Sequence, residues 1–185
     1  MSGAHIDPSN KKVAMLIAVL ALLLAFSETL GKSAQTEALS RNIEAANLWS
    51  FFQAKTIRMT TLRTAAEQAE LQLASAPGEA RQATAKRIED WRKTAARYDS
   101  EPDTGEGRKE LAQRAKAAET TRDRSLAAYH KYEIASGALQ IAIVLASAEV
   151  ITGAVFLLWA SASLGLLGLI FTTLGFVAPT ALHLF

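Results

Sequence analysis

The chain has 185 residues, no cysteine, and a formal net charge of +2 from 20 Lys and Arg against 18 Asp and Glu. The absence of cysteine excludes disulfides, thiolate metal sites and cysteine nucleophiles. Charges of both signs are interspersed, so there is no basic face to follow a phosphate backbone, and we expect no nucleic-acid partner. The apolar residues gather toward the two ends, whereas residues 32–136 hold 18 of the basic and 15 of the acidic side chains.

A short polar tail, residues 1–12, precedes the first apolar run. This run, "VAMLIAVLALLLAFSETL", begins at Val13 and ends at Leu30. Its length matches a hydrocarbon core of about 30 Å at about 1.5 Å per helical residue, which predicts a transmembrane helix over residues 13–31. A cleaved signal peptide is the alternative, because "KK" comes before a short apolar core that ends in the small-residue sequence "AFS".

The charged middle of the chain, residues 32–136, favours helices throughout. It is rich in Ala, Glu, Gln, Lys and Arg and shows no two-residue period. Two breaker segments divide it, one at a tip near residues 76–78 and one near residues 99–107. Because the chain must return to the membrane face that it left, we expect one ascending helix and two descending helices in series. These form a helical hairpin stalk on the order of 65 Å long.

Apolar residues of the stalk recur at alternating steps of three and four, which predicts a coiled-coil-like heptad seam between its two arms. Lys55 is the one polar member of this seam on the ascending helix. The ascending arm contributes Ala45, Leu48, Phe52, Lys55, Met59, Leu62, Ala66, Ala69 and Leu73, and the descending arm contributes Ile88, Trp91, Ala95, Tyr98, Leu111, Ala115 and Ala118.

The stretch "NLWSFF" places three large rings within four positions of the ascending helix. Phe52 falls on the seam, where we expect it to face the small residues of 115–118. Successive helical positions diverge by about 100°, so Trp49 and Phe51 project to either side of the seam. We expect at least one of them to meet a neighbouring subunit or a partner protein, and Trp91 is a further candidate interaction residue.

Nearly every residue between 138 and 184 is apolar, which predicts two more transmembrane helices, 137–160 and 163–184, joined near the sequence "SAS". Just before them, "YHKY" predicts an interfacial belt of tyrosines with a lysine that reaches toward water. Glycines in the last helix mark positions where another helix packs closely: Gly165, Gly168 and Gly175. The predicted fold class is an all-α membrane protein with three transmembrane helices and a helical hairpin stalk between the first and second.

Glu149 is expected near the centre of the second of these apolar helices, where an ionised side chain costs several kcal/mol. In a tight hairpin its level falls near Thr172 and Thr173, whose hydroxyls would hydrogen-bond a protonated carboxyl. Two roles remain open at this point. A neutral Glu149 would join helices or subunits, and an ionisable Glu149 would serve as a proton or cation site.

The segments "GKSAQTEALSRNIEAANLWSFFQAKTIR" and "LQIAIVLAS" resemble a family of small bacterial inner-membrane proteins described as a domain of unknown function, number four-three-three-seven. The resemblance extends over nearly the whole chain, and its specific part is "KSAQTEAL" together with "WSFFQAKTIR". It implies an N-terminal membrane helix, a helical extramembrane segment and a C-terminal membrane hairpin, and it implies no activity. The linker of the hairpin is often basic in such proteins, whereas residues 160–163 here are uncharged.

The sequence contains no Gly-rich phosphate loop and no catalytic signature with suitable spacing. Its three histidines, His5, His130 and His183, are remote from one another. We therefore expect no enzyme, no cofactor and no metal. The expected function is a non-enzymatic membrane scaffold or adaptor that forms a homo-oligomer or binds a larger membrane complex. The alternative is an ion or proton transport component that uses Glu149.

The expected location is the bacterial inner membrane, with the lipid bilayer as the first partner. Lys11 and Lys12 precede the first apolar helix and favour a cytoplasmic N-terminus by the positive-inside rule, which places the stalk in the periplasm. Five basic residues on the stalk side and the uncharged linker between the last two membrane helices oppose this assignment; the five are Lys32, Arg41, Arg122, Arg124 and Lys131. Segments as long as the stalk, however, cross largely regardless of charge.

Overall fold

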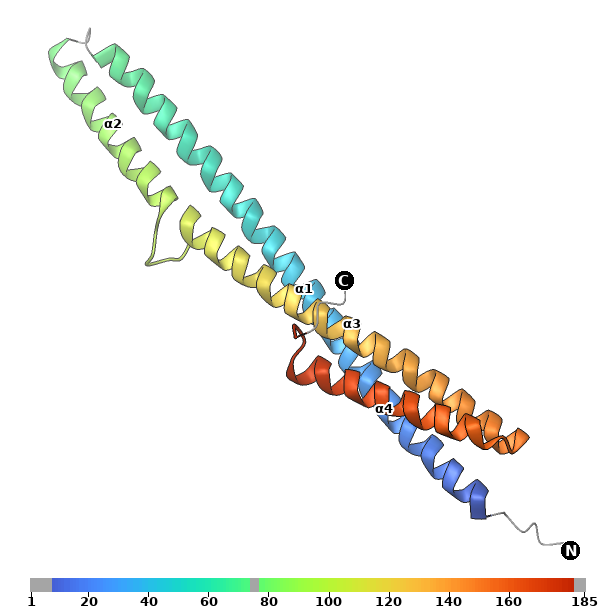
Figure 1. Ribbon diagram of the computed structural model, residues 1–185. Coiled ribbons are helices and arrows are strands. Elements are labelled where there is room, and N and C mark those ends of the chain that lie inside the picture. Colours follow the sequence, from blue (N-terminus) through green and yellow to red (C-terminus); the bar gives the residue numbers. More distant parts are fainter. Residues whose placement is uncertain (1–7, 74–76, 182–185) are drawn as a thin grey trace, which may run out of the picture. The chain divides into compact units, whose positions relative to one another are not determined.

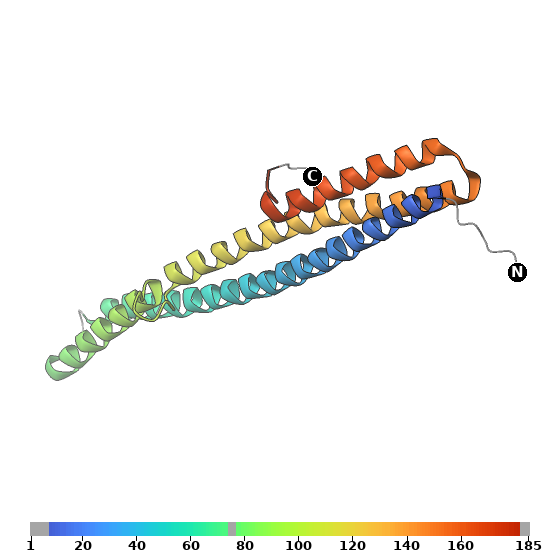
Figure 2. The same ribbon diagram turned by 90° about the horizontal axis from the view of Figure 1, so that it is seen from below.

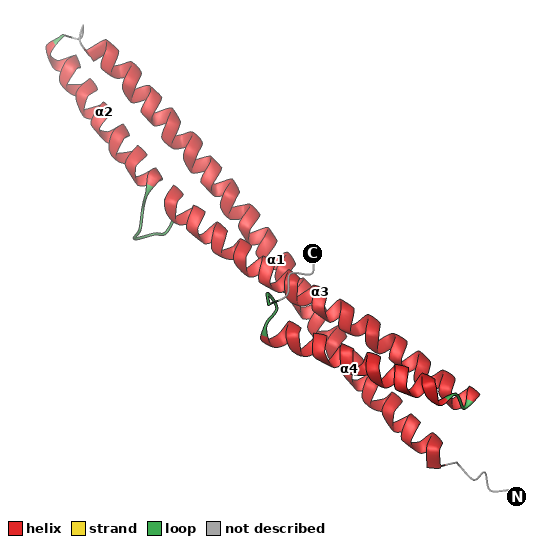
Figure 3. Cartoon of the chain, viewed as in Figure 1, coloured by secondary structure: helices red, strands yellow, loops and turns green. Residues whose placement is uncertain are grey.

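The structure, a computed structural model, describes residues 8–73 and 77–181, and these residues form four helices (Figure 1). The helices are α1 (Pro8–Leu73), α2 (Gly78–Asp99), α3 (Arg108–Thr152) and α4 (Val155–Val177). The described residues contain no strand (Figure 3). Three helices, α1, α3 and α4, are long and apolar enough to cross a membrane. The predicted fold class is therefore confirmed as all-α with three helices suited to a bilayer.

The chain divides into two compact units. The membrane unit comprises residues 1–39 and 121–185, and the stalk unit comprises residues 40–120. Helices α1 and α3 each contribute one part to each unit. Three predicted segments lie wholly or partly outside the described ranges. They are the N-terminal tail, residues 74–76 of the tip, and the last residues of the third membrane helix.

Small residues of α4 bring the three helices of the membrane unit into close contact. Gly165 lies against Leu20 of α1, and Gly168 lies against Leu139 of α3. A β carbon added at Gly168 would come within 2.6 Å of the Leu139 side chain and 3.1 Å of the carbonyl oxygen of Ala135. Because lipid tails are as apolar as leucine, packing of this kind, rather than escape from water, holds membrane helices together.

Buried hydroxyl groups add hydrogen bonds between these helices. Ser161 of α4 donates from Oγ to the carbonyl oxygen of Ala142 in α3 at 2.7 Å. Ser27 of α1 donates to the carbonyl oxygen of Tyr132 in α3 at 3.2 Å. Both serine side chains are fully buried. A buried hydroxyl that has an acceptor stabilises the packed state, because an unpaired donor away from water is costly.

The turn between α3 and α4 comes earlier than the sequence suggested. Helix α3 ends at Thr152 and α4 begins at Val155, so the small residues of "SAS" lie within α4 rather than between two helices. Gly153 adopts φ +68° and donates its N–H to the carbonyl oxygen of Glu149 at 2.7 Å. This left-handed conformation ends a helix at little cost only for glycine. Gly153 and Ala154, which form the turn, are uncharged, as are residues 160–163, where the sequence had placed it.

Lys131 occupies a position that the sequence did not predict. The side chain is only 2% exposed, and Nζ donates a hydrogen bond to the carbonyl oxygen of Pro179 at 2.6 Å. Pro179 follows the C-terminus of α4, where unpaired carbonyls carry partial negative charge. Lys131 therefore ties the end of α4 to α3 instead of reaching toward water.

In the stalk unit, α2 and the first part of α3 follow one another alongside α1 (Figures 1 and 2). All the predicted seam positions are buried or half-buried in this unit. The polar member, Lys55, has its ammonium 3.9 Å from a carboxylate oxygen of Glu106 and 5.1 Å from the centre of the Tyr98 ring. A second ion pair joins Arg92 of α2 to Glu70 of α1.

We predict that Gly168→Ala lowers the thermal stability of the detergent-solubilised protein by about 1–3 kcal/mol, the usual cost of overpacking. The added β carbon meets Leu139 and the backbone of α3. The matched control is Gly137→Ala on α3, where a β carbon meets nothing within 4 Å. Helix propensity alone leaves that variant as stable or more stable. Equal unfolding temperatures for Gly168→Ala and the unsubstituted protein would contradict close packing of α4.

Candidate interaction site on the stalk

An aromatic cluster lies where α1 meets the start of α3. Trp49 and Phe52 pack edge to face, with ring centres 5.4 Å apart and ring planes at 82°. Both rings are half-buried against a small apolar core of Leu48, Leu111 and Ala115. The fully buried alanine leaves room for the rings, as expected from the pairing of large with small residues.

Trp49 is tied to its own chain. Its indole Nε1 donates a hydrogen bond to Oε1 of Glu119 on α3 at 2.8 Å. The level of this contact agrees with the expected pairing of the rings with residues 115–118, and a tryptophan buried in this way needs such an acceptor. Trp49 is therefore mainly a residue of the hairpin itself, and Glu119 is a partner that sequence reasoning missed.

Phe51 differs from its neighbours, because its side chain is 60% exposed. Phe52, in contrast, is covered on one side by the guanidinium of Arg108, which lies 5.1 Å from the ring centre. Trp91 on α2 is half-buried beneath the guanidinium of Arg87, 5.9 Å away, and is not among the residues that line the cleft described next. Of the four rings predicted to take part in interactions, Phe51 is the most available to a partner.

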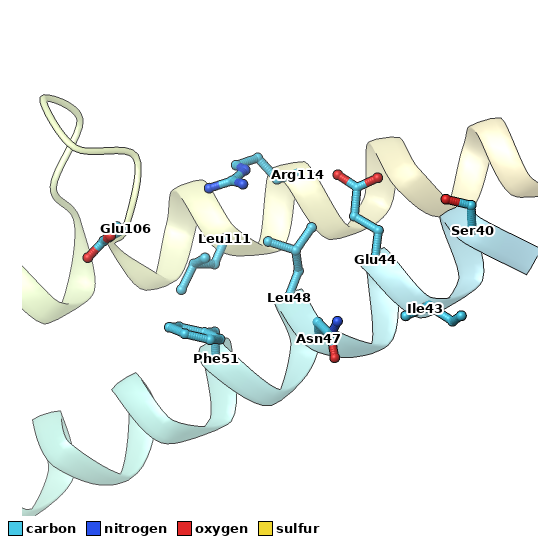
Figure 4. A pocket seen from close by; sticks show the side chains of 9 residues that line it. All are labelled: Ser40, Ile43, Glu44, Asn47, Leu48, Phe51, Glu106, Leu111 and Arg114. Atoms are coloured by element: carbon cyan, nitrogen blue, oxygen red, sulfur yellow. The ribbon is translucent and has the colours of Figure 1, made fainter. Parts of the chain in front are cut away.

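A cleft of about 470 Å³ opens beside this cluster (Figure 4). Leu48, Phe51 and Leu111 provide apolar surface in it, and Ile43, at 54% exposure, extends this surface. Polar and charged side chains complete the lining: Ser40, Glu44, Asn47, Glu106 and Arg114. Apolar side chains that converge from two helices, with a few charged groups around them, are typical of a surface that binds the side chain of another protein.

The loop between α2 and α3 supplies Glu106 to the cleft and is itself well fixed. Glu110 in the first turn of α3 accepts hydrogen bonds from the Ser100 hydroxyl at 2.6 Å and from the backbone N–H of Glu101 at 3.2 Å. Gly107 packs so closely that a β carbon there would overlap the backbone of Glu101 and Ser100. Gly105 adopts φ +67°, which favours glycine.

Electrostatic interactions strengthen this loop at neutral pH. The hydrogen bond from Ser100 is the main reason that the pKa of Glu110 lies below its usual value. Lys109, whose ammonium lies 3.0 Å from Asp99, is the main reason that the pKa of Asp99 is also lowered. Both carboxylates are therefore stabilised in their charged form by the folded loop.

The structure does not place Glu149 beside Thr172 and Thr173, with which the sequence predicted it to interact. Glu149 lies in the last turn of α3, close to the turn at Gly153, and not at the centre of an apolar helix. Thr172 hydrogen-bonds to the carbonyl oxygen of Gly168 and lies 3.4 Å from Ser27 Oγ. Thr173 donates to the carbonyl oxygen of its own helix residue Leu169. The expected contact between Glu149 and the threonines is therefore wrong.

The early turn explains this difference. Gly168 lies beside Leu139 and Gly175 beside Tyr132, which places the threonines between these two levels of α3. Glu149 is at least ten residues farther along α3, or about 15 Å. Its side chain is 7% exposed, and within the described residues its Oε2 is buried without a hydrogen-bond partner.

In the described ranges, no three His, Asp or Glu side chains lie close enough to hold a metal ion. His130 pairs with Glu133 alone, at 3.4 Å between Nδ1 and Oε2.

Comparison with known proteins gives one match. The model of a family described as "Domain of unknown function (DUF4337)" matches residues 9–178. No curated protein and no solved structure matches the chain.

We predict that acid destabilises the loop between α2 and α3. The pKa values of Asp99 and Glu110 are lower in the folded state than in the unfolded state, where they are about 3.9 and about 4.3. The stability that these two carboxylates contribute is therefore complete above their unfolded-state pKa values. It is lost as the pH falls through their folded-state pKa values. The double variant Asp99→Asn, Glu110→Gln should unfold at a lower temperature at pH 7 and lose less stability between pH 7 and pH 3.

Thermal unfolding followed by circular dichroism tests this prediction. The control is Glu79→Gln with Asp103→Asn, which removes the same charge from the stalk unit without touching these hydrogen bonds. If the Asp99 and Glu110 double variant and the unsubstituted protein lost equal stability in acid, the two carboxylates would not stabilise the loop.

Proposed function

Because the chain belongs to the family described as "Domain of unknown function (DUF4337)", a description that names no activity, we propose its function from its architecture. We propose that it is a non-enzymatic membrane scaffold or adaptor. Three apolar helices anchor it in a bilayer. The helical stalk binds either further copies of the chain or another membrane complex.

The observation that carries this proposal is the exposed apolar surface beside the stalk cleft. Phe51 and Ile43 keep more than half of their side-chain surface exposed, at 60% and 54%, on a segment rich in charged residues. Large apolar side chains that remain in water at the edge of a cleft are typical of binding sites. Covering a phenylalanine ring contributes about 1.5–3 kcal/mol, enough to make it an anchor of an interface.

The charges around the cleft support binding over catalysis. Glu44, Glu106 and Arg114 line it, and Arg114 lies 3.5 Å from the carbonyl oxygen of Gly105, a contact that holds it near the loop. Ser40 is the one hydroxyl among the side chains that line the cleft, and no histidine lines it, so the cleft lacks the serine–histidine arrangement that activates a hydroxyl. Charges placed around an apolar surface select partners and orient them.

The proposed location is the bacterial inner membrane, with the stalk in the periplasm. The pair Lys11 and Lys12 supports this orientation by the positive-inside rule. The short connection after α3, Gly153 and Ala154, would then face the cytoplasm, and because it carries no positive charge the assignment depends on the lysine pair. A reporter fused beside Gly78 tests the orientation, and activity in the cytoplasm alone would reverse it.

We predict that Phe51→Ala lowers the mass of the complex extracted gently from the membrane, because it removes the most exposed ring beside the cleft. Helix content should not change, since Phe51 contributes little to the hairpin. The control is Gln82→Ala on the exposed surface of α2, which should leave the mass unchanged. Equal masses of the Phe51→Ala and unsubstituted complexes would show that the cleft is not the site at which the stalk binds its partner. Trp49→Ala is unsuitable here, because it also breaks the hydrogen bond to Glu119.

A second function, ion or proton transport, is favoured by one observation. Within the described residues, Glu149 keeps a buried carboxylate oxygen without a hydrogen-bond partner, and ionisable groups in membrane segments often lie on ion paths. Its place near the α3–α4 turn puts it close to one end of both helices rather than midway along them.

Glu149→Gln separates the two functions. Under the scaffold proposal, vesicles that contain the unsubstituted protein show no protein-dependent proton or cation flux, and the variant assembles as before. A flux that appears with the unsubstituted protein and disappears with Glu149→Gln, at unchanged complex mass, would favour transport.

A further inference from the structure

The side of α1 that faces away from the hairpin carries a second regular pattern. Nine positions of the stalk unit follow alternating steps of four and three, and all nine are exposed. We call them the outer face: Ile43, Asn47, Ser50, Ala54, Ile57, Thr61, Thr64, Gln68 and Leu71. The first two also line the cleft, so the outer face borders it at this end. This spacing is that of a heptad seam, on the side of the helix opposite to the seam already buried in the hairpin.

None of the nine residues is charged, although exposed helix surfaces normally carry most of the charge. Charged residues of the same helix fall elsewhere, as at Arg58, Arg63 and Glu67. Three large apolar side chains lie on the outer face at intervals of fourteen residues, and two of them, Ile57 and Leu71, are 67% and 82% exposed. The pattern is thus uncharged and partly apolar along eight helical turns.

The middle of the outer face is concave. A shallow hollow of about 540 Å³ is lined by residues of α1 alone: Thr56, Ile57, Thr60, Thr61, Thr64, Ala65 and Gln68. In a parallel coiled coil, each seam side chain enters a hole formed by four residues of the facing helix. The sets 57, 60, 61, 64 and 61, 64, 65, 68 have the spacing of two successive holes. The hollow therefore has the residues needed to receive side chains of a neighbouring helix.

Two of the three hydroxyl groups on this face, those of Ser50 and Thr61, do not oppose burial. Ser50 donates to the carbonyl oxygen of Ala46, and Thr61 donates to that of Ile57, each at 2.9 Å within the same helix. A hydroxyl that already has an acceptor is buried without leaving an unpaired donor. The threonines then present their methyl groups to whatever covers the face.

We propose that the outer face binds the same face of α1 from a second copy of the chain, with the two helices parallel and in register. This inference rests on the proposed scaffold function and names the partner. Copies inserted in one membrane in the same sense carry their α1 helices parallel, with equal residues at equal heights. Around the resulting two-fold axis each residue meets its own copy, so any charge on the axis would meet a like charge. The absence of charge at all nine positions satisfies this condition, which a different partner helix would not impose.

Two further residues favour this arrangement. Asn47 takes the heptad position at which a single asparagine fixes the register and favours two strands in parallel coiled coils. Phe51 flanks the seam, and in a parallel pair the flanking residue five positions earlier on the other copy is Ala46. A ring that is 60% exposed then packs over one of the smallest side chains.

The contact is weak in free solution, because small or polar residues fill most of the outer face. Anchoring both copies in one membrane raises their effective concentration, so a modest interface suffices there. Dilution into detergent should separate the copies.

Single cysteines test this inference directly, because the natural chain has none. Ile57→Cys and Thr64→Cys, oxidised in the native membrane, should give disulfide-linked dimers, since residues that meet across the axis come within the Cα separation of about 4.4–6.8 Å that a disulfide needs. Arg63→Cys is the matched control, exposed on the same helix but about 100° from Thr64. We expect at least a tenfold higher dimer yield at 57 and 64 than at 63. Equal yields at the three positions, or no dimer at any, would overturn the inference.

A charge variant provides the second arm. Ile57→Lys in the Thr64→Cys background places two ammonium groups at the axis and should abolish the crosslink, whereas Arg63→Lys should leave it. A crosslink that survives Ile57→Lys would also overturn the inference. Failure of this contact is distinct from failure of the scaffold function. If only the contact is wrong, a complex that depends on Phe51 is still extracted without crosslinks at the outer face, and if the scaffold function is wrong, no complex is extracted at all.

Discussion

A hairpin of two helical arms covers only one side of each helix, and this limit governs the stalk unit. Helix α1 buries its heptad seam against α2 and the start of α3, with Leu48, Met59 and Ala66 at less than a tenth exposure. In the described part of the stalk unit, Ile57 and Leu71 on its opposite side remain exposed. A stalk of this kind buries too little surface to explain the exposed apolar residues by its own folding. Under the proposed scaffold function, binding to another protein chain would cover them.

Small residues and hydrogen bonds, rather than a heptad seam, hold the helices of the membrane unit together. Glycines of α4 allow Leu20 and Leu139 to approach the backbone, and the hydroxyls of Ser27 and Ser161 bond to carbonyls of α3. Lys131 completes the unit where α4 ends. All of these contacts join residues of the same chain. In the described part of the unit, the carboxylate of Glu149 is the buried group that lacks a full set of partners, and it lies by the turn.

Local patterns in the sequence predicted the helical elements and the buried side of the stalk. Periods of three and four place Leu48, Phe52 and Ala115 correctly against one another, because burial must repeat with the helical turn. Proline and glycine between residues 99 and 107 stop helices for local steric reasons, and α2 ends and α3 begins around them. The same reasoning failed at "SAS", because small residues serve both turns and close packing in a membrane. The glycine at 153, which ends α3, was the better signal.

Such local patterns could not predict hydrogen-bond partners that lie far apart in the sequence. The acceptor of Trp49, Glu119, lies 70 positions away, and the acceptor of Lys131 lies 48 positions away. Neither pairing follows from spacing, because each depends on how two helices are aligned. The misplaced turn had the same effect on Glu149, since moving the turn of a hairpin by eight residues, from 161–162 to 153–154, moves every opposite pair. The aromatic residues were identified from the sequence, but only the structure separates Phe51 from Trp49.

The central claim is that this chain acts as part of an assembly. The most direct measurement is the mass and composition of the particle released from its native membrane by gentle extraction. The account predicts a particle that contains either at least two copies of the 19.9 kDa chain or the chain together with another membrane protein. A monodisperse single chain with no accompanying protein, extracted under conditions that keep other membrane complexes intact, would contradict it.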